Sequence, residues 1–202
     1  MLSNVTTPQE LDERFRSAIG ALTVTGTRRA ADEPVREGSR LTGELALRLF
    51  GAQLTSRHLD LAARWLRSFG EGFYTVASSG HEGNAAVAAA LRWSDPALLH
   101  YRSGAFYCTR ATDPELETES DPVRDVLRGV VASVQEPIAG GRDKVFGNFG
   151  LHVIPTTATV ASHLPRAAGV AFAIERGRRL AAIGSALRPR ASAGAELARL
   201  GW

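Results

Sequence analysis

The chain has 202 residues, of which 44% are hydrophobic and 22% are charged, values typical of one globular domain with a packed core. It contains no run of 18 apolar residues, no secretory signal and a single cysteine, Cys108, so we expect a cytoplasmic protein without membrane spans or disulfides. Its 24 basic residues, all arginine except Lys144, exceed the 21 acidic ones by a net charge of +3 and are scattered, which favours codon bias over nucleic-acid binding.

The first predicted elements are helical. Residues 1–40 are a polar extension, within which four apolar residues recur at helical spacing: Leu11, Phe15, Ile19 and Leu22. Residues 25–40 carry almost no large apolar side chain, so we expect them to wrap a surface or to stay disordered. From Leu41 the apolar spacing predicts one long amphipathic helix, or two helices broken near Gly51. Gly70 suits the left-handed cap at its end.

Shorter elements come next. Residues 78–80 predict a turn, and residues 82–91 predict an alanine-rich helix that we expect to be buried. Residues 97–101 read as a short buried strand, residues 111–122 as an acidic loop and residues 123–134 as a helix. A polar turn then precedes a helix of small residues at 163–174. Residues 176–202 are rich in arginine and alanine with weak periodicity, so we expect them to be poorly packed.

Generic catalytic motifs are absent from the sequence. His81-Glu82 begins like the zinc motif H-E-x-x-H, but Ala85 replaces the second histidine. The sequence contains neither the nucleophile elbow G-x-S-x-G nor the phosphate-binding and dinucleotide-binding glycine motifs. Composition and generic motifs therefore predict an α-rich α/β domain and no particular chemistry.

Four segments in chain order are more informative: RLFGAQLTSRHLDLAARWL, GFYTVASSGHEGNAAVAAAL, DPALLHYRSGAF and IPTTATVASHLPRAAGVAFAIE. In order and spacing they resemble the alpha part of the E1 component of thiamine-diphosphate-dependent 2-oxoacid dehydrogenases, of the pyruvate and branched-chain type. The nearest likeness is to actinobacterial enzymes in which alpha and beta parts are fused. The resemblance implies an α/β fold of the thiamine-diphosphate-binding type, a parallel sheet flanked by helices, with only its N-terminal part present.

The same resemblance divides the chain into three parts. Residues 1–40 are the polar extension, residues 41–175 a partial E1-alpha-like domain, and residues 176–202 an atypical tail. We expect a truncated chain, and the tail suits either a reading-frame shift or a genuine split subunit completed by another polypeptide.

Cofactor contacts carried over from the family fall on two segments. A Tyr-Arg pair that reaches the diphosphate of thiamine diphosphate corresponds to Tyr101 and Arg102, preceded by His100. An arginine fork offers several donors to phosphate oxygens, and a tyrosine hydroxyl adds one more. In the later turn, the residue matching Val160 offers its carbonyl to the 4′-amino group of the pyrimidine, and the residue matching Ala158 makes a neighbouring contact.

Two metal sites belong to the family pattern. Branched-chain enzymes bind potassium at positions that match Thr157, Thr159, Ser162 and His163, although the family usually has glutamine where this chain has His163. Magnesium is held by a G-D-G motif and a later asparagine, and this sequence contains no Gly-Asp pair. Asp121 and Asn148 have a similar separation, but Asp121 lies upstream of the pyrimidine-binding turn. Magnesium would therefore need a segment that these residues do not include.

The implied function is that of a fragment or subunit of an E1 component, which decarboxylates a 2-oxoacid oxidatively and transfers the acyl group to lipoyl. The glutamate that activates the cofactor belongs to the beta part, so we predict no catalytic residue here and no activity of the chain alone. The implied partners are a homologous or beta-type E1 chain and a lipoyl-bearing E2. The alternative is a non-catalytic interaction module whose small-residue helices pair with a homologous chain.

Overall fold

The computed structural model describes residues 7–23, 26, 28–72, 77–116, 118–136, 138 and 145–187. It divides into two units, residues 1–160 and 161–202. The elements are α1 (Pro8–Gly20), α2 (Gly43–Ser68), α3 (Asn84–Ala90), β1 (Ala97–Leu98), α4 (Gly104–Ala111), α5 (Pro122–Val130), β2 (Val153–Ile154) and α6 (His163–Leu187). The described part of the chain is thus α-rich with a small parallel sheet, which is compatible with the predicted α/β class. No helix within it is long and apolar enough to cross a membrane.

Helix α2 is continuous, so the predicted alternative of a break near Gly51 is wrong. Thr42 caps its start by accepting a hydrogen bond from the backbone N–H of Leu45 at 3.2 Å. Gly70 follows its end with φ 78°, which confirms the predicted left-handed cap. The segment before α2 is held to the first turn of the helix, since Gly43 and Glu44 donate their backbone N–H groups to the carbonyls of Glu33 and Ala31 at 3.1 and 2.7 Å. This pairing favours a wrapped segment over a disordered one.

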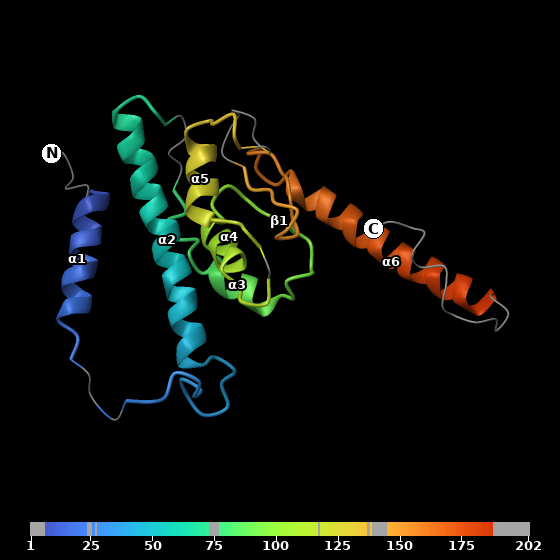
Figure 1. The fold of residues 1–202 in the computed structure, drawn as a ribbon, viewed down its shortest axis with the longest axis horizontal. Coiled ribbons are helices and arrows are strands. Elements are labelled where there is room, and N and C mark those ends of the chain that lie inside the picture. The colour runs from blue at the N-terminus through green and yellow to red at the C-terminus, as the bar shows by residue number, and fades with distance from the viewer. Residues whose placement is uncertain are drawn as a thin grey trace. The chain divides into compact units, whose positions relative to one another are not determined.

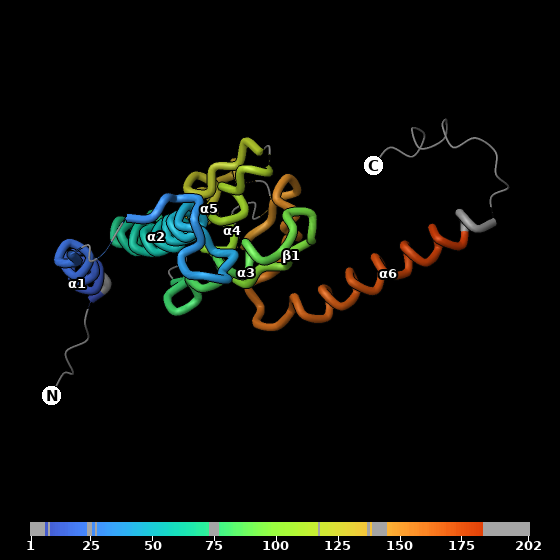
Figure 2. Tube along the Cα trace, turned by 90° about the horizontal axis from the view of Figure 1, so that it is seen from below, coloured from blue at the N-terminus to red at the C-terminus, as the bar shows by residue number. Residues whose placement is uncertain are grey.

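Helix α1 contains three of the four apolar residues predicted to lie at helical spacing in the extension, and Leu22 lies beyond its end. A capping box begins the helix, because Thr7 and Glu10 exchange side-chain-to-backbone hydrogen bonds. Figures 1 and 2 show α1 alongside α2, on the side away from α3, α4 and α5. The Phe15 and Phe50 rings lie 6.1 Å apart between these two helices, and His58 faces Asp12 at 3.8 Å.

The core of the first unit lies between α2 and the three shorter helices. Helix α4 packs mainly against α2 and α3, and all eight of its residues are buried. Helix α5 closes the cluster through Val126 and Val130. The expected burial of the alanine-rich helix holds for one face of α3, where Ala85 and Ala88 are buried, but its Val87 is exposed. The helix predicted at 82–91 is shorter at both ends, and the one predicted at 123–134 begins one residue earlier and ends at Val130.

Strands β1 and β2 form a two-stranded parallel sheet in which Ala97 pairs with Val153 and Leu98 with Ile154. The predicted strand at 97–101 is therefore real but shorter, because the chain turns at residues 101 and 102. Parallel strands point their carboxyl ends to the same edge of a sheet. The segments that follow β1 and β2 consequently leave the sheet side by side.

The second unit consists of α6 and the residues around it. The helix starts at His163 as predicted but continues to Leu187, well past the predicted end at residue 174. Leu180 and Ile183 are 57% and 55% exposed, in agreement with the poor packing expected of this stretch. The expected character of residues 188–202 lies outside the described residues.

Candidate cofactor site

Two sequence-predicted groups lie after the carboxyl ends of the parallel strands. Tyr101 and Arg102 come shortly after β1, and the turn at residues 157–160 comes shortly after β2. The hydroxyl of Thr156, itself buried, donates a hydrogen bond to the Leu99 carbonyl at 2.7 Å and ties the two segments together. The carboxyl edge of a parallel sheet is where open α/β proteins bind ligands. The first unit therefore brings together the starts of the two segments for which the family resemblance implies cofactor contacts.

Arg102 is half-buried and held on two sides. One guanidinium nitrogen donates a hydrogen bond to the carbonyl of Ala77, in the loop before α3. The guanidinium carbon lies 5.5 Å from the centre of the Tyr101 ring, within the range of a cation–π contact. A guanidinium carries five N–H donors, so these contacts leave others for a ligand. The side chain is suited to binding an anion.

A hydrogen bond from the main chain defines which nitrogen of the His100 imidazole is an acceptor and which is a donor. The backbone N–H of Arg102 donates to its Nδ1 atom at 3.3 Å. A neutral imidazole that accepts at one nitrogen carries its proton on the other, so Nε2 is the donor of His100. Its ring lies 3.8 Å from the Tyr101 ring and stacks with the ring of His81 at 6.4 Å. His100, Tyr101 and Arg102 thus form one group of rings and N–H donors.

Beneath this group lies a buried polar network that sequence reasoning missed. Asp60 of α2 is 3% exposed and accepts two hydrogen bonds from Ser78, one from its backbone N–H at 2.8 Å and one from its hydroxyl at 2.6 Å. Ser56, one turn earlier in α2, lies 2.9 Å from the Ser78 hydroxyl. A signal was present in the sequence, since Asp60 falls at helical spacing among the residues of α2 that face the core.

The turn at residues 157–160 is more open. Thr159 donates its backbone N–H to the Thr157 hydroxyl at 3.3 Å, and Val160 is 69% exposed. The four residues predicted to hold potassium are divided between the two units: Thr157 and Thr159 belong to the first, and Ser162 and His163 to the second. Among the described residues, no group of three or more His, Cys, Asp or Glu side chains could hold a metal ion.

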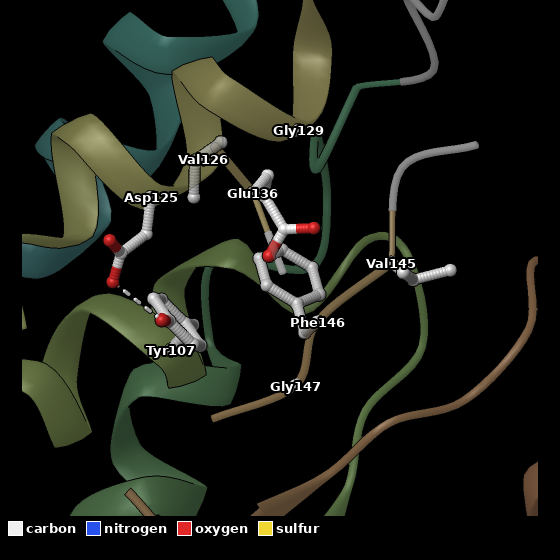
Figure 3. A pocket seen from close by; sticks show the side chains of 8 residues that line it. All are labelled: Tyr107, Asp125, Val126, Gly129, Glu136, Val145, Phe146 and Gly147. Carbon is white, nitrogen blue, oxygen red and sulfur yellow. Dashed lines mark hydrogen bonds between the residues drawn. The ribbon is translucent and has the colours of Figure 1, made fainter. Parts of the chain in front are cut away.

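A small polar cavity lies elsewhere in the first unit, between α4 and α5 (Figure 3). The Tyr107 hydroxyl donates to Asp125 at 2.8 Å and accepts from the Asn148 amide at 3.2 Å. The cavity of about 20 Å³ has room for roughly one water molecule, too little for a cofactor. Burial raises the pKa of Tyr107 well above its usual value. These groups connect elements of the fold and are not a site for a large ligand.

The two residues whose spacing resembles that of magnesium ligands are accounted for by local structure. Asp121 caps α5 by accepting hydrogen bonds from the backbone N–H groups of Val123 and Arg124. Asn148 donates to the Ser120 hydroxyl at 2.7 Å as well as to Tyr107. The two side chains serve separate structural roles.

Comparison of the chain with known protein families, with curated proteins and with solved structures finds no match in any of the three. The function of the chain is therefore inferred from the geometry of the site and from the resemblance of its segments.

Proposed function

We propose that the chain is a cofactor-binding domain of the thiamine-diphosphate type, with the cofactor at the carboxyl edge of the β1–β2 sheet. The observation that carries this proposal is the meeting of two segments at that edge, the residues around Arg102 and the turn at residues 157–160. They are separated by some fifty residues in the sequence, and the family resemblance assigns them to the two ends of one cofactor.

More specifically, we propose the alpha part of an E1 component of a 2-oxoacid dehydrogenase. Thiamine diphosphate supplies the carbanion chemistry of 2-oxoacid decarboxylation, and the protein supplies binding and orientation. The residues present fit its diphosphate, because the half-buried Arg102 follows the β1 strand and its guanidinium carries more N–H donors than the contact with the Ala77 carbonyl uses. Magnesium would be supplied by a further segment, and the activating glutamate by a beta-type partner chain.

In this proposal, the residues of the chain have binding roles. Arg102 and Tyr101 bind diphosphate oxygens, and His100 adds a donor. The main chain at Val160 and Ala158 receives the pyrimidine, so the side chains there are free to vary. None of these groups transfers a proton in the reaction. A homologous or beta-type chain would complete the site, and a lipoyl-bearing E2 would accept the acyl group.

Calorimetric titration with thiamine diphosphate tests the proposal. We expect heat of binding with the wild-type chain and a loss of at least about ten-fold in affinity for Arg102→Ala, because a charge-assisted hydrogen bond contributes about 1.5–3 kcal/mol. Arg92→Ala is the matched control, since Arg92 is an exposed arginine paired with Asp95 at 2.7 Å outside the site. Absence of binding by the wild-type chain, or equal losses in both variants, would contradict the proposal.

A second candidate, a non-catalytic interaction module, is favoured by the apolar side chains exposed on two helices. They are Val87 of α3 and Leu164, Phe172 and Ile174 of α6. Exposed apolar patches of several hundred Å² mark interfaces or aggregation-prone surfaces. We expect the chain to associate at micromolar concentration in a sedimentation experiment. Association without thiamine-diphosphate binding would favour this candidate, and a monomer that binds no hydrophobic dye would argue against it.

A further inference from the structure

The buried carboxylate of Asp60 is hydrogen-bonded to Ser78, the residue that follows Ala77, whose carbonyl accepts a hydrogen bond from Arg102. Arg102 donates to the Ala77 carbonyl, and the next residue, Ser78, gives both its backbone N–H and its hydroxyl proton to Asp60. Burying a carboxylate is costly unless it is paired, and Asp60 is paired both by the two Ser78 donors and by the guanidinium of Arg57, which lies 3.9 Å away, so the conformation of Ser78 that supplies both donors is favoured. Asp60 therefore restrains the backbone at residues 77 and 78.

The same network reaches the start of α4. Because the Ser78 hydroxyl donates its single proton to Asp60, the hydroxyl of Ser56 must be the donor between the two serines. A Cβ atom on Gly104 would lie only 2.5 Å from the Ser56 hydroxyl oxygen, so α4 begins in close contact with α2. The network thus reaches Arg102 from two sides. It contacts Ser78, next to the Ala77 carbonyl that accepts a hydrogen bond from Arg102, and it contacts the first residue of α4, which follows Arg102 closely in the chain.

We infer that Asp60 is a positioning residue for Arg102, acting through Ser78 and the Ala77 carbonyl. Asp60 touches no ligand itself. It fixes the carbonyl that takes one nitrogen of the guanidinium, and the remaining N–H donors are thereby pre-oriented toward an anion at the sheet edge. An arginine side chain has many rotamers, and holding it in one of them before binding raises affinity. This inference rests on the proposed function, since it assigns the anion as the diphosphate of the cofactor.

Two ligands separate positioning from general stability: thiamine diphosphate and thiamine, which lacks the diphosphate. We expect Asp60→Ala to weaken thiamine diphosphate binding by about ten-fold in calorimetry, with thiamine binding unchanged. Asp60→Asn keeps a carbonyl oxygen that can accept both Ser78 donors, so we expect it to recover most of the affinity. Tyr107→Phe, which removes the partly buried hydrogen bond to Asp125, should leave the ratio of the two affinities unchanged.

A double-mutant cycle gives the sharpest result. If Asp60 acts through Arg102, Asp60→Ala should cause no further loss of thiamine diphosphate affinity in an Arg102→Ala background. A full additional loss, or equal weakening of thiamine and thiamine diphosphate in the single variant, would overturn the inference. Should Asp60→Ala fail to fold, Ser78→Ala replaces it in the same cycle, because it removes one of the two hydrogen bonds and keeps the backbone N–H.

The outcomes for the proposal and the inference are distinct. A wild-type chain that binds no thiamine diphosphate overturns the proposed function and this inference with it. A wild-type chain that binds, with folded Asp60 and Ser78 variants that bind equally well, overturns the inference alone. Selective loss of diphosphate affinity that disappears when Arg102 is absent supports both.

Discussion

Helices α4 and α6 are both rich in small residues, and they have opposite environments. Every residue of α4 is buried, including the polar Thr109 and Arg110. In α6, each residue from 171 to 183 is exposed, including Phe172 and Leu180. Alanine and glycine content therefore does not decide whether a helix is buried. In α4 the polar side chains have backbone partners, as when the Thr109 hydroxyl donates to the Ala105 carbonyl at 2.8 Å, and such pairing permits burial.

The arginines of the two helices give the largest expected difference. Arg110 is 2% exposed and donates to the carbonyls of Asp95 and Leu151 at 2.8 and 3.2 Å. Arg110→Met would leave these carbonyls without their donor, and we expect a loss of about 3 kcal/mol in the free energy of unfolding, measured by denaturant titration. Arg179 pairs with Glu175 on the exposed surface of α6, so Arg179→Met should cost less than about 0.5 kcal/mol. Similar losses of unfolding free energy in the two variants would show that burial does not make the arginine of α4 more important for stability than that of α6.

Glycine substitution tests packing in the same way. Gly104 begins α4 where an added Cβ would meet the Ser56 hydroxyl oxygen at 2.5 Å. Gly104→Val should destabilise the chain by about 1–3 kcal/mol, because overpacking forces α2 and α4 apart. Pairing it with Ser56→Gly, which removes the obstructing hydroxyl, should recover part of that loss. A valine variant as stable as the wild type would mean that the two helices can separate at little cost.

Tyr107 of α4 makes stability depend on pH. Burial raises the pKa of Tyr107 in the folded chain above the ordinary value of about 10, which the unfolded chain keeps. At a pH between the unfolded and the folded pKa, the unfolded chain therefore loses a proton that the folded chain keeps. The contribution of Tyr107 is therefore complete below about pH 10 and is lost as the pH rises above it. We expect the free energy of unfolding to fall above pH 10 less steeply in Tyr107→Phe than in the wild type, with the variant about 1 kcal/mol less stable at neutral pH. Parallel curves for the two proteins would contradict this assignment.

The contrast between α4 and α6 also explains what the sequence predicted. Helix α2 has one apolar face and clear end signals at Thr42 and Gly70, and its prediction was sound. Helix α4 was not predicted, because a short helix buried on all sides shows no apolar stripe. The extension of α6 was missed for the converse reason, since alanine and arginine favour a helix by propensity without marking a face.

The candidate site also has a part that could be predicted from the sequence and a part that could not. The segments after β1 and β2 could be named from the sequence because their residues form local motifs. The core-facing positions of Ser56 and Asp60 could be inferred from their helical spacing, but their contacts with Ser78 could not, because these depend on the approach of a loop some eighteen residues away in the sequence. Contacts of this kind are determined by tertiary packing, so the pattern of residues along the chain does not predict them.

The smallest expected effect concerns Gly177, inside the exposed part of α6. Apart from its chain neighbours and the backbone of its own helix, no atom lies within 4 Å of the position that a Cβ would occupy there, so Gly177→Ala should meet no steric obstacle. Replacing glycine by alanine inside a helix is favourable by about 0.5–1 kcal/mol, chiefly because the unfolded chain loses conformational freedom. We expect a small gain in helical circular dichroism and slower amide exchange within α6. Gly129→Ala in α5, also without an obstructing atom, is the control in the first unit and should leave exchange in α6 unchanged. A loss of helicity in Gly177→Ala would show that this position is in contact with another chain, and that the exposure of α6 does not persist in solution.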